Sequence, residues 1–312
     1  MKRRELLKSA AAFGCMATIP FSTVGDFALS SGRASEPKDV KNPTTTPTAL
    51  KPPASGTIPV AFLLSKGAVV IDFTGPWEVF HEVMIPGRME HPFHVYTVAE
   101  TAAPIRASGG LKIVPDYTFA TAPAPKVIVI PAQSDPTQAT LAWLRKSANT
   151  ADVTMSVCTG AFVLAQTGLL AGKAATTHHS AYRELAAAFP DITVKRGARF
   201  VDQGNIASAG GLSSGIDLAL HVVERYFGRD VAQSVAYNME YQGQGWLNAD
   251  SNEIYAKARV STDEHPICPV CDMDVDKSTA LKSVYKGKTY YFCSGDHKQQ
   301  FDAAPEKYLS AA

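Results

Sequence analysis

The chain has 312 residues, a length that suits one large domain with a smaller one, and 46% hydrophobic residues supply enough apolar surface for a packed core. Its 30 basic and 29 acidic residues leave a net charge of +1, which excludes an electrostatic footprint for nucleic acid or for an anionic membrane. The five cysteines are spaced unlike a disulfide framework and indicate one isolated thiol and a C-terminal cluster.

Residues 1–30 have the features of an export signal. Arg3 and Arg4 are followed by Leu6, Leu7 and a mildly apolar stretch, a pattern typical of the twin-arginine route of bacterial export. We therefore expect a periplasmic protein; the alternative is an amphipathic basic N-terminus on a cytosolic one. No later segment approaches 18 consecutive apolar residues, so we predict no membrane span in the mature chain.

Two segments are predicted to separate the folded parts of the chain. Residues 31–57 are rich in Pro, Thr, Ser and Lys, and such a composition buries too little surface to offset the entropy of ordering, so we expect a flexible spacer. Residues 243–265 form a second predicted linker. The folded parts are then an α/β domain over residues 58–242 and a Cys-rich module over residues 266–312.

Within the large domain, short apolar runs alternate with segments of helical spacing. The runs IPVAFLL, FHVYTVA, KVIVIPA and VTMSV are rich in β-branched residues, as buried strands are. Helices are expected near residues 76–84, 137–149, 159–170, 179–188, 213–228 and 230–240. The stretch RFVDQGNIASAGG is typical of a hairpin, because Gly204-Asn205 permits a tight turn. The alternation predicts a mostly parallel sheet with helices on both faces, a three-layer α/β sandwich.

Cys158 lies where the run VTMSV ends and a helix-like pattern begins. Sites in parallel sheets form at the carboxyl ends of strands, and a strand that turns directly into a helix can hold a nucleophile in a strained, exposed turn. Because a helix N-terminus favours thiolate over thiol, we expect a lowered pKa for this cysteine. The alternative is a buried structural cysteine.

The stretch SVCTGAFVLAQTGLLAGKAATTHHSAYREL, with FLLSKGAVVIDFTGPWEVF upstream, resembles the ThiJ/PfpI family of the class I glutamine amidotransferase-like superfamily. Within that family it is most similar to isonitrile hydratases and to the sensor domains of AraC-type regulators. The resemblance covers most of residues 58–240. It implies a flavodoxin-like fold, a nucleophile elbow at Cys158, cysteine chemistry that requires no cofactor, and a homodimer.

The resemblance also assigns roles to residues around Cys158. Asp72 would lie beside the cysteine, where like-charge repulsion keeps a carboxyl protonated and able to donate a proton; alternatively, Asp72 only caps a helix. Thr159 would position the reaction intermediate. His178 matches a histidine that relatives keep close to the sulfur, and the neighbouring His179 competes for that assignment.

Gly75, Ala132 and Gln133 are the residues that we expect at the substrate. Many relatives have Gly-Gly at the strand end that contains Ala132 and Gln133, so an oxyanion hole built from these backbone amides stays an open assignment. Members with peptidase-like chemistry have a histidine directly after the cysteine. This chain has Thr159 there, which argues against proteolysis.

The C-terminal module holds a second set of reactive side chains, Cys268, Cys271, Cys293 and His297. Thiolates with one imidazole suit copper or zinc, and a metal would stabilise a unit too small for a sufficient core. VYKGKTYYFCS is typical of a hairpin and GDHKQQFDAAPEKYL of a short helix. The alternative, in an oxidising compartment, is a disulfide such as Cys268–Cys271.

Residues 266–309 resemble the YHS/TRASH family of small metal-binding modules, which implies that these four residues bind a metal ion. Such modules usually have Gly where Asp272 stands and a third cysteine where His297 stands. The histidine keeps a ligand but reduces the thiolate content, which shifts the expected preference from copper(I) toward zinc.

Three functions follow from these observations. The first is an exported isonitrile hydratase-like enzyme that forms a thioimidate at Cys158. The second is a non-enzymatic periplasmic metal or redox sensor or carrier. The third is a glyoxalase- or deglycase-like activity on α-oxoaldehydes. The expected partners are a small-molecule substrate, a metal ion and a second copy of the chain, with no nucleic acid.

Overall fold

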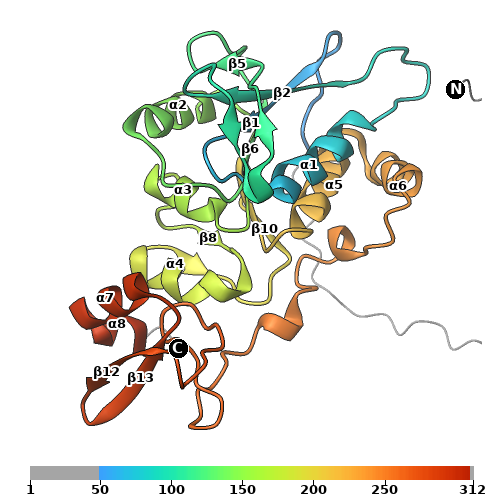
Figure 1. Cartoon of the computed structure of the whole chain (residues 1–312). Coiled ribbons are helices and arrows are strands. Elements are labelled where there is room, and N and C mark those ends of the chain that lie inside the picture. Colours follow the sequence, from blue (N-terminus) through green and yellow to red (C-terminus); the bar gives the residue numbers. More distant parts are fainter. Residues whose placement is uncertain (1–48, 310–312) are drawn as a thin grey trace, which may run out of the picture. The chain divides into compact units, whose positions relative to one another are not determined.

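A computed structural model describes residues 49–309 (Figure 1). The predicted export signal over residues 1–30 lies outside the described residues, as does most of the predicted spacer. Within the described part of that spacer, Leu50 packs against the core and donates its N–H to the Arg225 carbonyl at 2.7 Å. The spacer is therefore anchored at this point instead of being free along its whole length. In the described range, no helix has the length and apolarity needed to cross a membrane.

The α/β domain is built on a seven-stranded sheet that is parallel except at one edge. In spatial order its strands are β10 (Phe200–Asp202), β11 (Ile206–Ala209), β7 (Val153–Val157), β6 (Val127–Ile130), β1 (Ile58–Leu63), β2 (Phe93–Ala99) and β5 (Tyr117–Thr118). Within this sheet, only β10 and β11 pair antiparallel, across the predicted hairpin turn at Gly204. Two pairs of short strands in the same domain lie outside the seven-stranded sheet: β3 (Ile105–Arg106) with β4 (Lys112–Ile113), and β8 (Ala174–Ala175) with β9 (Thr193–Val194).

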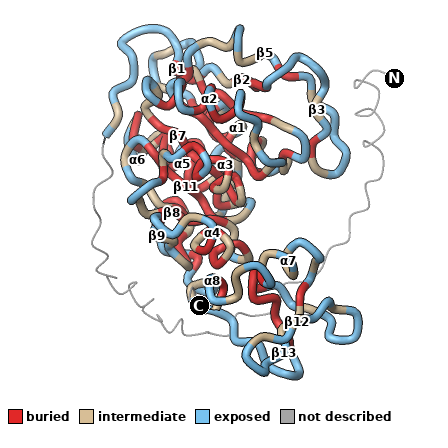
Figure 2. Tube along the Cα trace, turned by 90° about the vertical axis from the view of Figure 1, so that its left-hand side faces the viewer, coloured by how far each residue is buried: buried red, intermediate tan, exposed pale blue. Residues whose placement is uncertain are grey.

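Helices cover both faces of this sheet, as predicted (Figure 1). They are α1 (Val70–His81), α2 (Gln138–Ala148), α3 (Gly160–Gln166), α4 (Tyr182–Ala188), α5 (Ser214–Phe227) and α6 (Arg229–Asn238). Alternate side chains of β1 divide between two cores: Val60 and Phe62 share one with α1, α5 and α6, and Ala61 and Leu63 share the other with α2, α3 and α4. The strands are buried on both sides (Figure 2), which explains their continuous apolar runs.

Two helices differ from the sequence prediction. α1 begins at Val70, not near residue 76, and Pro76 lies inside it. Tertiary hydrogen bonds satisfy the amides at its start, because Val69 N–H donates to the Ala132 carbonyl and Val70 N–H to the Ser108 hydroxyl, and local sequence does not reveal such partners. α3 ends at Gln166, four residues early, because Gly168 adopts a left-handed conformation just after it.

The C-terminal module consists of a hairpin and two helices. The strands β12 (Leu281–Tyr285) and β13 (Lys288–Phe292) meet in a turn at Lys286-Gly287. The predicted single helix is instead α7 (Gly295–Ala303) and α8 (Pro305–Leu309), because Pro305 cannot continue α7. A small core under these elements includes Val270, Phe292, Phe301 and Tyr308.

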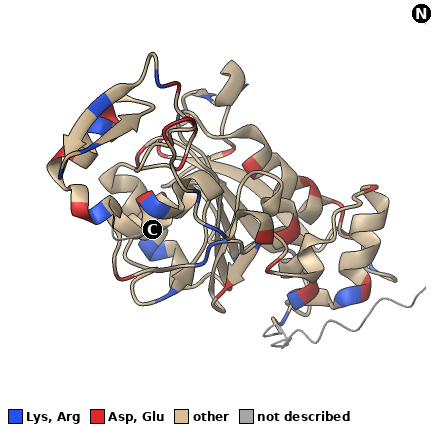
Figure 3. Cartoon of the chain, turned by 90° about the horizontal axis from the view of Figure 1, so that it is seen from below, with Lys and Arg blue, Asp and Glu red and all other residues tan. Residues whose placement is uncertain are grey.

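The predicted linker over residues 243–265 is partly packed against the α/β domain. It contains two single helical turns, η3 (Gly245–Leu247) and η4 (Glu253–Tyr255). Trp246 is buried, and the Ala249 carbonyl accepts from Arg199 N–H at 2.6 Å. Basic and acidic positions are interspersed over the helices and loops (Figure 3), as the near-zero net charge predicts.

Candidate functional site

Cys158 occupies a strained turn between β7 and α3. Its φ is +58°, a left-handed conformation that costs a residue with a side chain about 1–2 kcal/mol. Three contacts hold it there: Cys158 N–H donates to the carbonyls of Ala209 (3.2 Å) and Gly210 (2.9 Å), and the Thr177 hydroxyl donates to the Cys158 carbonyl (2.9 Å). The residue is only 7% exposed. The geometry is that of the predicted elbow, with the sulfur at the carboxyl end of β7.

The start of α3 lies unusually close to the end of β6. A side chain at Gly160 would place its Cβ 2.2 Å from the Ile130 carbonyl oxygen and 2.8 Å from the Pro131 carbonyl carbon. Those neighbours are backbone atoms and cannot move aside cheaply. The glycine two residues after Cys158 is therefore required for the turn itself, not only for flexibility.

Asp72 lies beside Cys158, fully buried on α1. Its Oδ2 accepts from the Ala132 N–H at 3.0 Å, while its Oδ1 has no aligned hydrogen-bond partner among the described residues. Burial raises the pKa of Asp72 to about 7, with the Ala132 amide and the Cys158 thiol opposing that rise. Asp72 is not the cap of α1, because the helix begins two residues earlier. In the sheet, β6 lies between β1 and β7. Asp72, Ala132 and Cys158 follow β1, β6 and β7 in the chain, and the sheet therefore brings them together.

The prediction that the pKa of Cys158 is lowered is wrong. Burial first, and then the charge of Asp72, raise the pKa of Cys158 to about 11. The amides of Thr159 and Leu212 and the Thr159 hydroxyl act in the opposite direction but do not offset these effects. At neutral pH the pair therefore holds its proton on sulfur, and any negative charge resides on Asp72.

The other two residues predicted near the sulfur have different surroundings. Thr159 precedes α3, and its amide and hydroxyl both interact with Cys158. His178 instead shares a hydrogen bond between its Nδ1 and the Ser180 hydroxyl at 2.8 Å, and its ring lies against Gly211. Burial, followed by the charge of His179, lowers the His178 pKa. Among residues 49–309, no hydrogen bond joins His178 to Cys158, so a role for this histidine at the thiol stays a prediction.

The three residues expected at the substrate differ in what they can offer. Gly75 serves packing, because a Cβ there would lie 2.8 Å from Ile216 Cγ1. The Ala132 amide is already bonded to Asp72, so it is not free to form an oxyanion hole. Gln133 has a buried Oε1 without a hydrogen-bond partner in the described part of the chain, and it is the one of the three that can accept from a ligand.

Sequence reasoning missed Thr177 and Leu212. Thr177 is fully buried and fixes the Cys158 carbonyl, while the Leu212 amide interacts with the thiol and adopts a φ of +49°. The signal for Leu212 was the Ala-Gly-Gly that ends the predicted hairpin. β11 pairs with β7, so the loop after it reaches the same edge of the sheet as Cys158.

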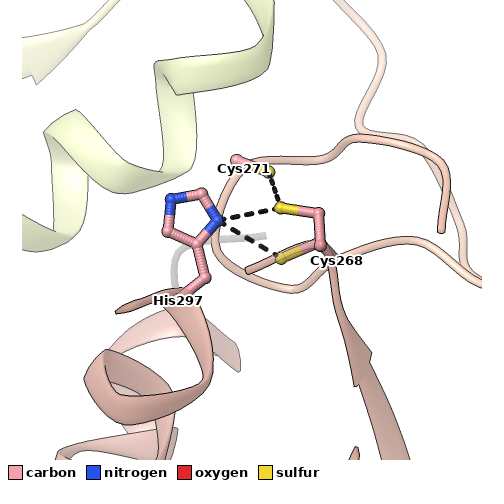
Figure 4. Close-up of side chains that lie close together, drawn as sticks. Cys268, Cys271 and His297 are labelled. Carbon is pink, nitrogen blue, oxygen red and sulfur yellow. Dashed lines mark hydrogen bonds between the residues drawn. The ribbon is translucent and has the colours of Figure 1, made fainter. Parts of the chain in front are cut away.

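In the C-terminal module the structure brings the four predicted metal ligands together. The ligand atoms of Cys268, Cys271, Cys293 and His297 all lie within 4.8 Å of one another. The Sγ atoms of Cys271 and Cys293 are 3.5 Å apart, and His297 Nδ1 lies 3.7 Å from Cys268 Sγ and 3.1 Å from Cys293 Sγ. Figure 4 shows Cys268, Cys271 and His297 close together. Tetrahedral zinc with bonds of about 2.3 Å to sulfur separates its ligand atoms by about 3.5–3.8 Å. The set fits such an ion.

The protonation of this cluster also suits a metal. The pKa of Cys268 is lowered to about 3, first by hydrogen bonding from Cys271 and then by His297, while the pKa of Cys271 is raised by that same bond and by burial. One thiolate is thus present before any metal arrives. The four described cysteines, Cys268 and Cys271 among them, are free thiols. The alternative Cys268–Cys271 disulfide is not formed.

Residues 59–225 match the model of the DJ-1/PfpI family. The chain belongs to this family. Residues 267–312 match the YHS domain. Over 187 residues the chain is 36% identical to an isonitrile hydratase of Pseudomonas putida. The aligned region covers 58% of this chain and 78% of the hydratase. It is also 29% identical over 184 residues to the HTH-type transcriptional regulator CdhR of Pseudomonas aeruginosa, covering 56% of this chain and 52% of the regulator. The chain thus spans about half the length of that regulator.

Solved structures support the fold. A ThiJ/PfpI family protein from Pseudomonas syringae is 29% identical, with a TM-score of 0.54, and covers 70% of this chain and 86% of that one. Drosophila melanogaster DJ-1beta, at 18% identity and a TM-score of 0.51, covers 59% of this chain and 98% of its own. At that identity the second likeness concerns the fold alone. Together they agree with the predicted flavodoxin-like sandwich, and the YHS match agrees with the attached Cys/His module.

Proposed function

We propose that this chain is an exported enzyme that adds water to a small electrophile through Cys158, with an isonitrile as the leading substrate. The observation that carries the proposal is the buried Cys158–Asp72 pair, whose pKa values lie at about 11 and about 7. The 36% identity to an isonitrile hydratase supports the choice of substrate. A carboxyl with a pKa near neutral can both accept and donate a proton during turnover.

The proposed reaction uses this pair in two stages. In the first, Asp72 takes the thiol proton as the sulfur attacks the terminal carbon of the isonitrile, and the same proton then passes to that carbon to give a thioimidate. In the second, Asp72 assists water to add across the carbon–nitrogen double bond. The adduct then breaks its carbon–sulfur bond, its hydroxyl proton returns to sulfur, and an N-substituted formamide leaves.

Neighbouring groups have matching roles in this proposal. The amides of Thr159 and Leu212 already favour negative charge on the Cys158 sulfur, so they stabilise the attacking thiolate. The unpartnered Oε1 of Gln133 is a ready acceptor for the N–H group that forms on the adduct. We assign His178 no proton-transfer step, because its imidazole is turned to Ser180.

The test is formamide production from a simple alkyl isonitrile by the purified mature chain. We expect turnover that is abolished by Cys158→Ala and reduced at least about 100-fold by Asp72→Asn. Cys293→Ser, which changes a thiol of the C-terminal module, is the matched control and should leave turnover in place. Unchanged turnover in Cys158→Ala would refute the proposal. Turnover of an α-oxoaldehyde without formamide production would replace it with the glyoxalase-like alternative.

We further propose that the C-terminal cluster holds zinc or copper(I). The donor set of Cys268, Cys271, Cys293 and His297 and its spacing support this assignment. When bound, such an ion would cross-link the loop around Cys268 to the hairpin and α7 of a module with a small core. Metal content of the purified chain, compared with Cys293→Ser, tests it; equal content in the two proteins would contradict it.

A metal carrier without enzymatic activity is the second candidate, and the same cluster favours it. Stoichiometric metal binding together with no formamide production would decide for it. Redox sensing at Cys158 is less well supported, because oxidation-sensitive cysteines are exposed thiolates, whereas this thiol is 7% exposed and its pKa is raised.

Export and dimerisation complete the proposal. The Arg3-Arg4 pair supports the twin-arginine route to the periplasm, and cell fractionation of a chain with both arginines changed to lysine tests it. The family resemblance supports a homodimer, and light scattering of the mature chain measures it directly. A cytosolic location of the unmodified chain, or a monomer at micromolar concentration, would contradict the respective part.

A further inference from the structure

One face of α4 is buried against the C-terminal module. Ala187 belongs to the same hydrophobic core as Cys268, Cys271 and Phe292, and α4 is in contact with α8. Arg183, one helical turn before Ala187, is also buried. The α/β domain therefore contributes side chains to the immediate surroundings of the cysteine cluster.

The loop between the first two cysteines is held by arginines from the α/β domain. Arg183 donates to the Pro269 carbonyl at 3.0 Å and lies 3.0 Å from Asp272 Oδ1, and Arg196 lies 3.4 Å from Asp272 Oδ2. The contact to Oδ1 is an ion pair without an aligned hydrogen bond. The side chains of Arg183 and Asp272 are 8% and 4% exposed, so removing Asp272 would leave Arg183 as a buried charge with no carboxylate partner among the described residues.

Asp272 adopts a conformation that would suit glycine. Its φ is +57°, and an Asp there is less relaxed than Gly would be. The side chain of Asp272 makes its ion pairs with Arg183 and Arg196, residues of the other part of the chain. The strained residue thus serves the contact between the two parts rather than the loop itself.

We propose that the metal centre is assembled by both parts of the chain: Arg183 on α4, together with Arg196, fixes the Cys268–Cys271 loop through Asp272. Metal binding and the docking of the module on α4 then stabilise each other, because each favours the same arrangement. This inference rests on the metal module of the proposed function and is independent of the hydratase chemistry.

The first test measures the affinity of the full mature chain for Zn²⁺ by competition with a chelating dye. Arg183→Gln changes no ligand, yet we expect it to weaken binding about tenfold or more, as loss of a group that holds the ligands in place does. Arg229→Gln, on the exposed surface of α6, is the matched control and should bind as tightly as wild type. Equal affinity of Arg183→Gln and wild type would overturn the role of Arg183.

The second test uses Asp272→Gly. A module that stands alone and a module held by the arginines predict opposite changes in Zn²⁺ affinity for this variant. If the module stood alone, glycine would relieve strain and leave Zn²⁺ affinity unchanged or higher. If the arginines act through Asp272, affinity falls, and Zn²⁺ no longer slows hydrogen exchange of the α4 amides. Asp302→Asn, on the exposed surface of α7, controls for the lost charge. Unchanged or tighter binding with wild-type protection of α4 would overturn the docking.

The outcomes also separate this inference from the proposed metal site. Wild-type chain that takes up no Zn²⁺ or copper(I) refutes both. Wild-type chain that binds Zn²⁺, with Arg183→Gln and Asp272→Gly binding equally well, refutes only the assembly by both parts. Far-ultraviolet circular dichroism of each variant establishes that the α/β domain is folded.

Discussion

Replacing Asp72 with asparagine should make the protein more stable at neutral pH while removing its chemistry. Burial raises the folded-state pKa of Asp72 from 3.8 to about 7. The unfolded chain ionises this carboxyl above pH 3.8, whereas the folded chain resists ionisation until about pH 7. The folded state therefore loses stability as pH rises through this window.

The size of this loss of folding stability follows from the shift in the pKa of Asp72. About three pKa units, at about 1.4 kcal/mol each, correspond to about 4 kcal/mol of lost folding stability above pH 7. The introduced asparagine cannot ionise, and its side-chain oxygen can still accept from the Ala132 amide. We expect Asp72→Asn and wild type to have equal stability near pH 3.5, and the variant to gain up to about 4 kcal/mol by pH 8.

The assay is urea unfolding of wild type and variant at intervals between about pH 3.5 and pH 8. Only the difference between the two proteins is used, because all other titrating groups cancel in it. A difference that stays constant with pH would refute the reasoning, as would a variant that is less stable than wild type at pH 8. Either result would mean that the Asp72 carboxyl ionises without hindrance in the folded protein.

Four further outcomes test neighbouring parts of the argument. Asp202→Asn should show a different pH dependence, because hydrogen bonding from His221 and the charge of Arg225 outweigh burial and lower the Asp202 pKa below 3.8. The variant should be less stable than wild type by a constant amount above about pH 4, and this deficit should shrink as pH falls below 3.8. Urea unfolding between about pH 2 and pH 5 checks it, and a deficit that does not shrink at low pH would contradict it. Thr177→Val removes the hydroxyl that fixes the Cys158 carbonyl and should cost about 1–2 kcal/mol of unfolding free energy, measured in the same assay. Gly160→Ala, which forces a Cβ against the Ile130 carbonyl, should cost more than about 2 kcal/mol and abolish formamide production; a stable, active variant would show that the elbow tolerates a side chain. In wild type, the rate of formamide production should fall as pH drops below about 7, because protonated Asp72 cannot accept the thiol proton, and a rate independent of pH between about 5 and 8 would assign the base to another group.

Periodicity and turn chemistry were sufficient to predict the sheet. The four strand-like runs and the hairpin at Gly204 all form, because strands buried on both faces leave an unmistakable apolar signal. The start of α1 was not predictable in this way. Its first amides are satisfied by Ala132 and Ser108, partners that only the folded chain brings near.

The candidate site, like the fold, was predicted only in part from the sequence. Cys158 was identified from its place at the end of a strand and Asp72 from a resemblance, and the structure places them side by side, yet the direction of the thiol pKa was predicted wrongly. A helix start is visible in sequence, whereas the burial that outweighs it depends on the whole fold. The role of Arg183 escaped notice altogether, because its significance depends on α4 lying against a module that begins some 80 residues later.

The raised pKa of Cys158 also bears on how the four described thiols can coexist in one protein. A soft metal must displace a proton before it binds sulfur, and at pH 7 a thiol with a pKa of about 11 is ionised in only about one molecule in ten thousand. Hydrogen bonding from Cys271 instead lowers the pKa of Cys268, which makes Cys268 the easier of the two to ionise. If the C-terminal cluster binds a soft metal as proposed, that metal is directed to the C-terminal thiols, and the Cys158 sulfur stays available for reaction.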